Sequence, residues 1–164
     1  MKYANMKKFL ILLLGLVSIS AQAKDDGLGL GIGIIAGTPT GLSLKKWTSD
    51  NRAIDAAAEW STSGKNKFYF HANYLIHNFD VLRPEDITGK LPVYYGIGGY
   101  IELNEDTSGN SNDDDILAVR IPLGVSYLFS DAPIELFAEV VPTMEISPDT
   151  DLGMDAAVGG RFYF

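Results

Sequence analysis

Eight segments of the chain alternate apolar and polar residues, which is the period of two that β-strands show. The predicted strands cover 28–36, 40–48, 52–61, 67–79, 90–103, 116–129, 133–146 and 152–164. The breaks between them are rich in Gly, Pro, Asn, Asp and Ser, the composition of turns. Eight consecutive strands joined by turns predict an all-β fold, an eight-stranded antiparallel up-and-down barrel.

The two faces of the predicted strands differ in polarity. One face carries Leu, Ile, Val, Ala and aromatic residues, and no charged residue falls in the set that we assign to it. The other face carries nearly every mid-strand charge. Its charged members are Lys45, Asp55, Glu59, Glu102, Arg120, Glu135, Glu139, Glu145, Asp155 and Arg161.

A soluble barrel, such as a periplasmic lipocalin-like binding protein, would place the apolar set inside and the charges outside. In a bilayer the reverse is expected, because Arg or Lys on the lipid face near mid-depth costs roughly 2 to 4 kcal/mol. A closed barrel also satisfies backbone groups that hydrocarbon cannot. The pattern therefore favours a transmembrane β-barrel, with the soluble binder as the alternative.

Aromatic residues are expected in two belts at the membrane interfaces. The ends of alternate strands place Trp47, Phe79, Tyr127, Phe129, Phe162 and Phe164 at one rim. The opposite rim collects Trp60, Phe68 and Phe70. This sorting by strand end is a second indication of a membrane barrel.

The N-terminal residues have the composition of a secretory signal peptide. Lys2, Lys7 and Lys8 precede an apolar run over 9–19, and Ala21-Gln-Ala23 follows as a cleavage site. We expect residues 1–23 to be removed, leaving 24–164 as one barrel domain. Without the three lysines, 10 basic side chains face 21 acidic ones, a net charge of −11 that disfavours a nucleic-acid partner. The chain has no cysteine, which excludes disulfides and a lipid-acceptor thiol.

The signal peptide, the eight alternating strands and the terminal Phe162-Tyr163-Phe164 together resemble the small eight-stranded outer-membrane barrels of Gram-negative-type bacteria, the OmpA transmembrane domain and OmpX kind. The resemblance implies an outer-membrane location, membrane lipids as neighbours and a monomer. It makes the three terminal residues an assembly signal for the barrel-assembly machinery. It also implies periplasmic termini, with the breaks at 37–40, 62–66, 104–115 and 147–151 outside.

Two features depart from that resemblance. The connection 80–89 is long for a periplasmic turn. Pro122 and Pro142 fall inside predicted strands, where each removes a ladder hydrogen bond and normally marks an edge or a bulge. A bulge would shift the alternation beyond it.

The lumen of an eight-stranded barrel is just wide enough for its own side chains. We expect its acidic and basic groups to form a structural network of ion pairs, with a narrow ion channel as the alternative. A lipid A-modifying enzyme is a further alternative, in which Glu59 would orient His71. However, Asn73 stands where the deacylase pattern of such enzymes has serine. We predict neither enzymatic activity nor a cofactor or metal.

The acidic stretch 104–115 is the candidate for contact with an extracellular partner, through Glu105, Asp106, Asp113, Asp114 and Asp115. It lacks the Asp-x-Asp-x-Asp-Gly spacing and closing Glu of a dedicated calcium loop. The sequence therefore predicts a non-enzymatic barrel with a structural or surface-interaction role.

Overall fold

The computed structural model describes residues 29–37, 40–61, 67–84, 87–104 and 115–164. The predicted signal peptide lies outside these residues, so its cleavage and the domain boundary stay predictions. The described strands are β1 (Leu30–Gly37), β2 (Thr40–Ser49), β3 (Arg52–Ser61), β4 (Lys67–Asn78), β5 (Val93–Asn104), β6 (Ile116–Arg120), β7 (Leu123–Leu128), β8 (Ile134–Ser147) and β9 (Leu152–Tyr163).

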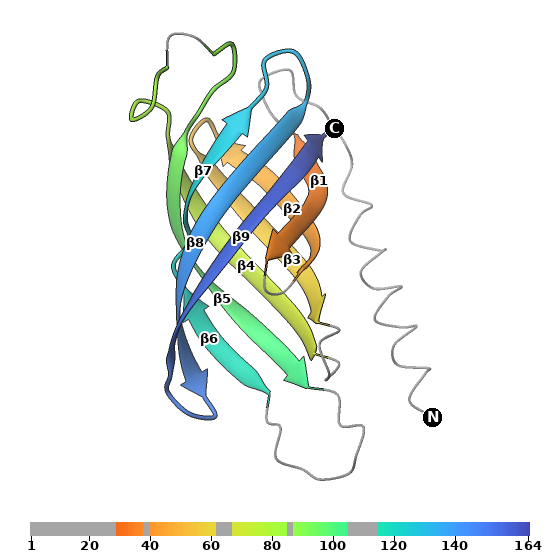
Figure 1. Ribbon diagram of the computed structural model, residues 1–164, viewed down its shortest axis with the longest axis vertical. Helices are drawn as coiled ribbons and strands as arrows, with labels where there is room; N and C mark the ends of the chain where they lie inside the picture. The colour runs from red at the N-terminus through yellow and green to blue at the C-terminus, as the bar shows by residue number, and fades with distance from the viewer. Residues whose placement is uncertain (1–28, 38–39, 62–66, 85–86, 105–114) are drawn as a thin grey trace, which may run out of the picture.

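These strands form one closed antiparallel ring (Figure 1). Consecutive strands pair along the chain except β6 and β7, and β1 pairs with β9, with Gly31 opposite Tyr163. Strands β6 and β7 are two halves of one strand, because both lie between β5 and β8. The architecture is thus the predicted eight-stranded barrel with its sixth strand interrupted. In the described part of the chain, no helix is long and apolar enough to cross a membrane.

The interruption falls at Pro122, which has no amide hydrogen to donate to the ladder. Its carbonyl still accepts from the amide of Gly96 at 3.0 Å, and the Pro142 carbonyl accepts from Ile121 at 2.9 Å. The register with β5 and β8 continues unchanged across the gap. Neither proline therefore lies at an edge of the sheet or shifts the alternation, although Pro122 divides the strand into β6 and β7. The irregularity in this region lies instead at Leu117 and Ala118, against the end of β8.

Apolar side chains cover the outside of the ring and polar ones fill the inside. None of the described residues assigned to the outer face is buried, while Lys45, Asp55, Glu59, Glu102, Arg120, Glu135, Glu139 and Arg161 are all buried. A small apolar cluster shares the lumen with them, made of Ile35, Ala53, Ala57, Leu75, Tyr94 and Phe137. For the described residues, the structure confirms the predicted assignment of the apolar side chains to the outer face and of the charged side chains of the network to the lumen.

We call the end where β1 begins and β9 finishes the terminal rim, and the opposite end the loop rim (Figure 1). The aromatic prediction at the terminal rim was wrong for Trp47 and Phe79. Both lie inside the mouth, where the Trp47 ring is 4.4 Å from that of His77 and 6.2 Å from that of Phe79. Phe129, Phe162 and Phe164 are exposed there as expected, and so are Trp60, Phe68 and Phe70 at the loop rim.

The long connection at the terminal rim spans 79–92, because β5 begins later than the predicted position 90. Pairing nevertheless extends outward from β5, since Lys90 and Leu128 exchange both backbone hydrogen bonds, at 2.9 and 2.8 Å. Pro92 lies between Lys90 and the start of β5, and it has no amide hydrogen to donate to the ladder. Its side chain is fully buried.

Candidate functional site

Glu135 is the centre of the polar network in the lumen. Its side chain on β8 is completely buried, with 0% exposure. It accepts hydrogen bonds from Lys45 Nζ at 2.6 Å and from the Tyr163 hydroxyl at 2.5 Å, and Arg161 Nη1 lies 3.4 Å away. Two cations and a hydroxyl thus compensate one carboxylate, which is what burying a charge requires.

Arg161, on β9, extends this network across the lumen. Its Nη2 donates to Asp55 Oδ2 at 3.1 Å and its Nε to Ser43 Oγ at 2.9 Å, while its guanidinium lies 4.0 Å from the centre of the Phe137 ring. Asp55 also accepts from Asn73 Nδ2 at 2.8 Å. The side chains from β2, β3, β4 and β8 are therefore tied to the last strand.

Lys45 links the network to the aromatic cluster in the mouth. Its Nζ is 2.9 Å from His77 Nε2 and 4.6 Å from the centre of the Trp47 ring. Because an ammonium group only donates, His77 accepts through Nε2 and carries its proton on Nδ1. The Trp47 indole in turn donates to the Tyr163 hydroxyl at 3.2 Å.

A second group of charges lies deeper in the barrel. Arg120 Nη2 is 3.4 Å from Glu139 Oε1, and the Tyr94 hydroxyl donates to Glu139 Oε2 at 2.8 Å. Glu59 Oε1 is 3.4 Å from His71 Nδ1, with both side chains buried. The pairing of Glu59 with His71 agrees with the geometry that the sequence suggested for them.

Toward the loop rim the lumen is more open and more acidic. Glu102 is buried on the inner face, whereas Asp155 and Glu145 are half-buried. Glu145 accepts from the Tyr100 hydroxyl at 3.2 Å. The nine predicted network residues thus all share the lumen face: four form the Glu135 network, Arg120 pairs with Glu139, Glu59 pairs with His71, and Glu102 and Asp155 lie near the loop rim.

Sequence reasoning did not assign four polar side chains to this network. Ser43, Trp47, Tyr94 and Tyr163 each hydrogen-bond to a charged member or to one another. Their positions alternate with Leu42, Leu44, Val93, Tyr95 and Phe162 on the outer face, so the period of two already indicated that they face the lumen. What it lacked was any indication that an aromatic hydroxyl or indole would serve as a partner in the lumen.

The terminal motif divides between the two faces. Phe162 and Phe164 are exposed with their rings 5.0 Å apart, whereas Tyr163 is buried. Of the candidate contact residues in the acidic stretch, Glu105, Asp106, Asp113 and Asp114 lie outside the described residues. Asp115 is described, and it is exposed.

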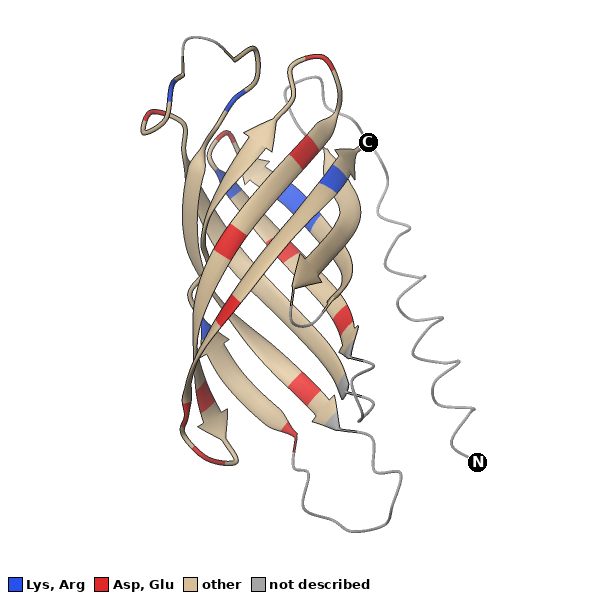
Figure 2. Ribbon diagram, in the orientation of Figure 1, with Lys and Arg blue, Asp and Glu red and all other residues tan. Residues whose placement is uncertain are grey.

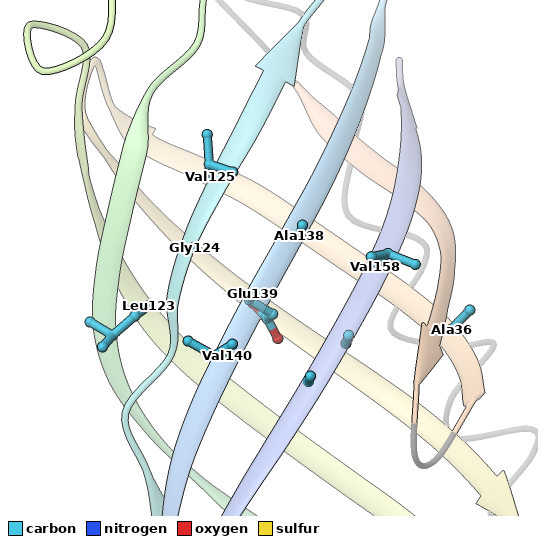
Figure 3. Close-up of a pocket in the computed structure, with 10 residues that line it drawn as sticks. Ala36, Leu123, Gly124, Val125, Ala138, Glu139, Val140 and Val158 are labelled. Carbon is cyan, nitrogen blue, oxygen red and sulfur yellow. The ribbon is translucent and has the colours of Figure 1, made fainter.

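A shallow hollow of about 420 Å³ crosses the outer surface of β7, β8, β9 and β1 (Figure 3). Small residues such as Ala138 form its floor, and Leu123, Val125, Val140 and Val158 surround them. Glu139 also contributes to the lining, but its carboxylate is held inside the lumen by Tyr94. The side chains at the outer opening are therefore apolar.

Removing the Tyr163 hydroxyl is expected to destabilise the barrel. Tyr163→Phe leaves buried Glu135 and the Trp47 indole each short of one partner, a loss of about 1 to 3 kcal/mol. Urea unfolding of the protein in lipid vesicles, followed by tryptophan fluorescence, measures it. Tyr95→Phe is the matched control, because Tyr95 faces outward and is 52% exposed. Equal losses in the two variants would contradict the role assigned to Tyr163.

The closed ring, with an apolar outside and a lumen filled by paired charges, defines the class of small membrane-type β-barrels. The structure is similar to the crystal structure of the N-terminal β-barrel domain of Pseudomonas aeruginosa OprF, with a TM-score of 0.57. The match covers 82% of this chain and 95% of that one at 12% sequence identity, and it shows a common fold. No protein-family model and no curated protein matches the sequence.

Proposed function

We propose that the protein is a non-enzymatic outer-membrane β-barrel with a structural or surface-interaction role, whose lumen is closed by its own paired charges. The observation that carries the proposal is the inverted distribution of polarity across the wall. Ile34, Leu42, Ile97, Val140 and Met154 are each at least 42% exposed, while Glu135 and Lys45 are at most 1% exposed. Water favours the opposite arrangement and hydrocarbon favours this one.

The extent of the apolar surface supports a membrane environment. Exposed large apolar residues occur on every strand of the ring, whereas soluble monomers rarely expose contiguous apolar patches above a few hundred Å². A lipocalin-like binder would enclose such residues. An outer-membrane location with periplasmic termini follows from the resemblance of the chain to small outer-membrane barrels, and the OprF fold is consistent with it.

The contents of the lumen favour a structural role over conduction. The Glu135 network spans the barrel near the terminal rim, and Tyr94, Leu75 and Phe137 are buried beside it. Side chains of this bulk leave little room for an ion path in a barrel of eight strands. Beside the Glu59 and His71 pair, the position two residues after His71 is Asn73 and not the serine of the deacylase pattern, and Asn73 is hydrogen-bonded to Asp55.

The surface-interaction part of the proposal rests on the 104–115 stretch, which connects β5 to β6 at the loop rim. In the proposed orientation this rim faces the exterior, so its acidic residues would be accessible to an extracellular partner. The terminal Phe162-Tyr163-Phe164 would serve as the assembly signal, and the barrel would act as a monomer.

The decisive experiment is electrophoresis of the membrane-fraction protein in SDS, with and without boiling. We expect the unboiled protein to migrate faster, because a closed barrel whose backbone groups are all paired resists SDS until it is heated. Extraction of the membranes with carbonate serves as the companion measurement and should leave the protein in the pellet. A single band, together with release into the soluble periplasmic fraction, would refute the proposal.

A further inference from the structure

Two cations on the outer surface distinguish the terminal rim. Lys46 shares the outward face of β2 with Leu44, and Arg52 shares that of β3 with Ile54. Both are exposed, although the sequence assignment of the outer face contained no charge. The register places Lys46 beside Ile54 and, beyond an irregularity between Trp47 and Ser49, places Arg52 opposite Ser49. The two cations therefore lie on neighbouring strands, at the same end of the sheet.

The exposed carboxyl group nearest to this pair in the sequence is that of Asp50, in the turn between β2 and β3. Within the part of the chain that the structure describes, neither Lys46 nor Arg52 forms a salt bridge. The other exposed cations at this rim have partners on the 79–92 connection: Arg83 pairs with Asp80, and Lys90 Nζ lies 5.9 Å from the centre of the Phe79 ring. Lys46 and Arg52 therefore face outward without an ion-pair partner among the described residues.

The pair stands at the edge of the apolar band. Leu30 lies opposite Lys46, and its carbonyl accepts a hydrogen bond from the amide of the terminal aromatic residue Phe164 at 3.1 Å. Aromatic residues mark the headgroup level of a bilayer. At that depth a cation on the outer face costs only about 0 to 1 kcal/mol, and long side chains reach the phosphates.

The two rims differ in their exposed charges (Figure 2). The terminal rim carries four exposed cations, Lys46, Arg52, Arg83 and Lys90, and three exposed aspartates, Asp50, Asp80 and Asp131, whereas the charged residues described as exposed at the loop rim are Asp115, Asp149 and Asp151. A lipid phosphate thus finds exposed cations among the described residues of the terminal rim, where they are interspersed with carboxylates.

We propose that Lys46 and Arg52 form a binding site for the phosphate of an anionic phospholipid in the leaflet that surrounds the terminal rim. Arginine presents a planar fork of donors that matches phosphate, and lysine adds a point charge. Leu30 and Ile54, directly beside Lys46, supply the surface for the acyl chains. The site rests on the proposed membrane-spanning function, and it adds a specific lipid partner to it.

The test uses the protein folded into phosphatidylcholine vesicles that contain a trace of spin-labelled lipid. Electron spin resonance gives the association constant of labelled phosphatidylglycerol relative to labelled phosphatidylcholine. We expect the natural protein to prefer phosphatidylglycerol, and K46Q/R52Q to bind it about five-fold more weakly for each cation removed. The control R83Q/K90Q removes the same charge from the same rim and should keep the preference.

The two proposals fail in different ways. If the natural protein immobilises both labelled lipids equally, or if the two double variants lose the preference to the same degree, the lipid site is refuted while the barrel stands. If neither labelled lipid is immobilised by any of the three proteins, the membrane-spanning function itself is refuted. Heat-modifiability of each variant confirms that it has folded before its lipids are compared.

Discussion

Glu135→Gln is expected to be the most destabilising single substitution in the lumen, lowering the free energy of unfolding by about 3 to 5 kcal/mol. The glutamine keeps the size of the side chain but removes the charge that compensates Lys45 and Arg161. Both cations are buried, at 1% and 4% exposure, so no solvent replaces the lost partner. The midpoint of urea unfolding in lipid vesicles measures the loss.

Glu145→Gln is the matched control for that measurement. Glu145 also lies on the inner face of β8, but it is half-buried and accepts one hydrogen bond, from Tyr100. We expect it to cost about 1 kcal/mol, the usual value of one hydrogen bond. A loss as large as that of Glu135→Gln would mean that the Glu135 network contributes no more than any other carboxylate in the lumen.

Val140→Arg is expected to cost about 2 to 4 kcal/mol, because it places a charge on the outer face near the middle of β8. Val140 is 49% exposed, so the longer side chain meets no steric obstacle. In water the same substitution at an exposed position would change stability by less than about 0.5 kcal/mol. Unfolding in vesicles measures the difference.

Two controls separate the charge from the size and the depth of the new side chain. Val140→Met adds length without charge and is expected to be nearly neutral. Thr48→Arg adds the same charge at the terminal rim, on the face of β2 that carries Lys46, and is expected to cost at most about 1 kcal/mol. Equal effects of the two arginines would show that the outer face of the barrel does not lie in hydrocarbon.

The alternation of residues was sufficient to predict the strands and their faces. The predicted bounds of the second and third strands differ from β2 and β3 by at most one residue at either end. This succeeds because a wall with lipid on one side and packed charges on the other imposes the period of two on every strand. Pro122 did not disturb it, since the loss of one donor leaves the register with β5 unchanged.

Two features of the structure could not be predicted from the sequence alone. The first is which charges meet across the lumen: Arg161 reaches Asp55 on β3, a partner that only the stagger of the closed ring determines. The second is where the apolar band ends. Trp47 was assigned to an interfacial belt but points inward to Tyr163, whereas Lys46, its neighbour, faces outward at the margin. At the end of a strand a side chain can face either the lumen or the outside, so composition alone does not determine its orientation.

The pairing of β1 with β9 has a consequence for the order of folding. Gly31 must find Tyr163, a contact between residues distant in sequence, and such contacts are slow to form because the intervening chain must first be brought together. Arg161 and Tyr163 can meet Glu135 on the adjacent strand β8 beforehand, but Arg161 reaches Asp55 and Tyr163 reaches Trp47 only when this contact exists. We therefore expect Lys45 and Asp55 to stay hydrated until closure, which places the dehydration of these charges in the final step of folding and opposes reopening of the completed ring.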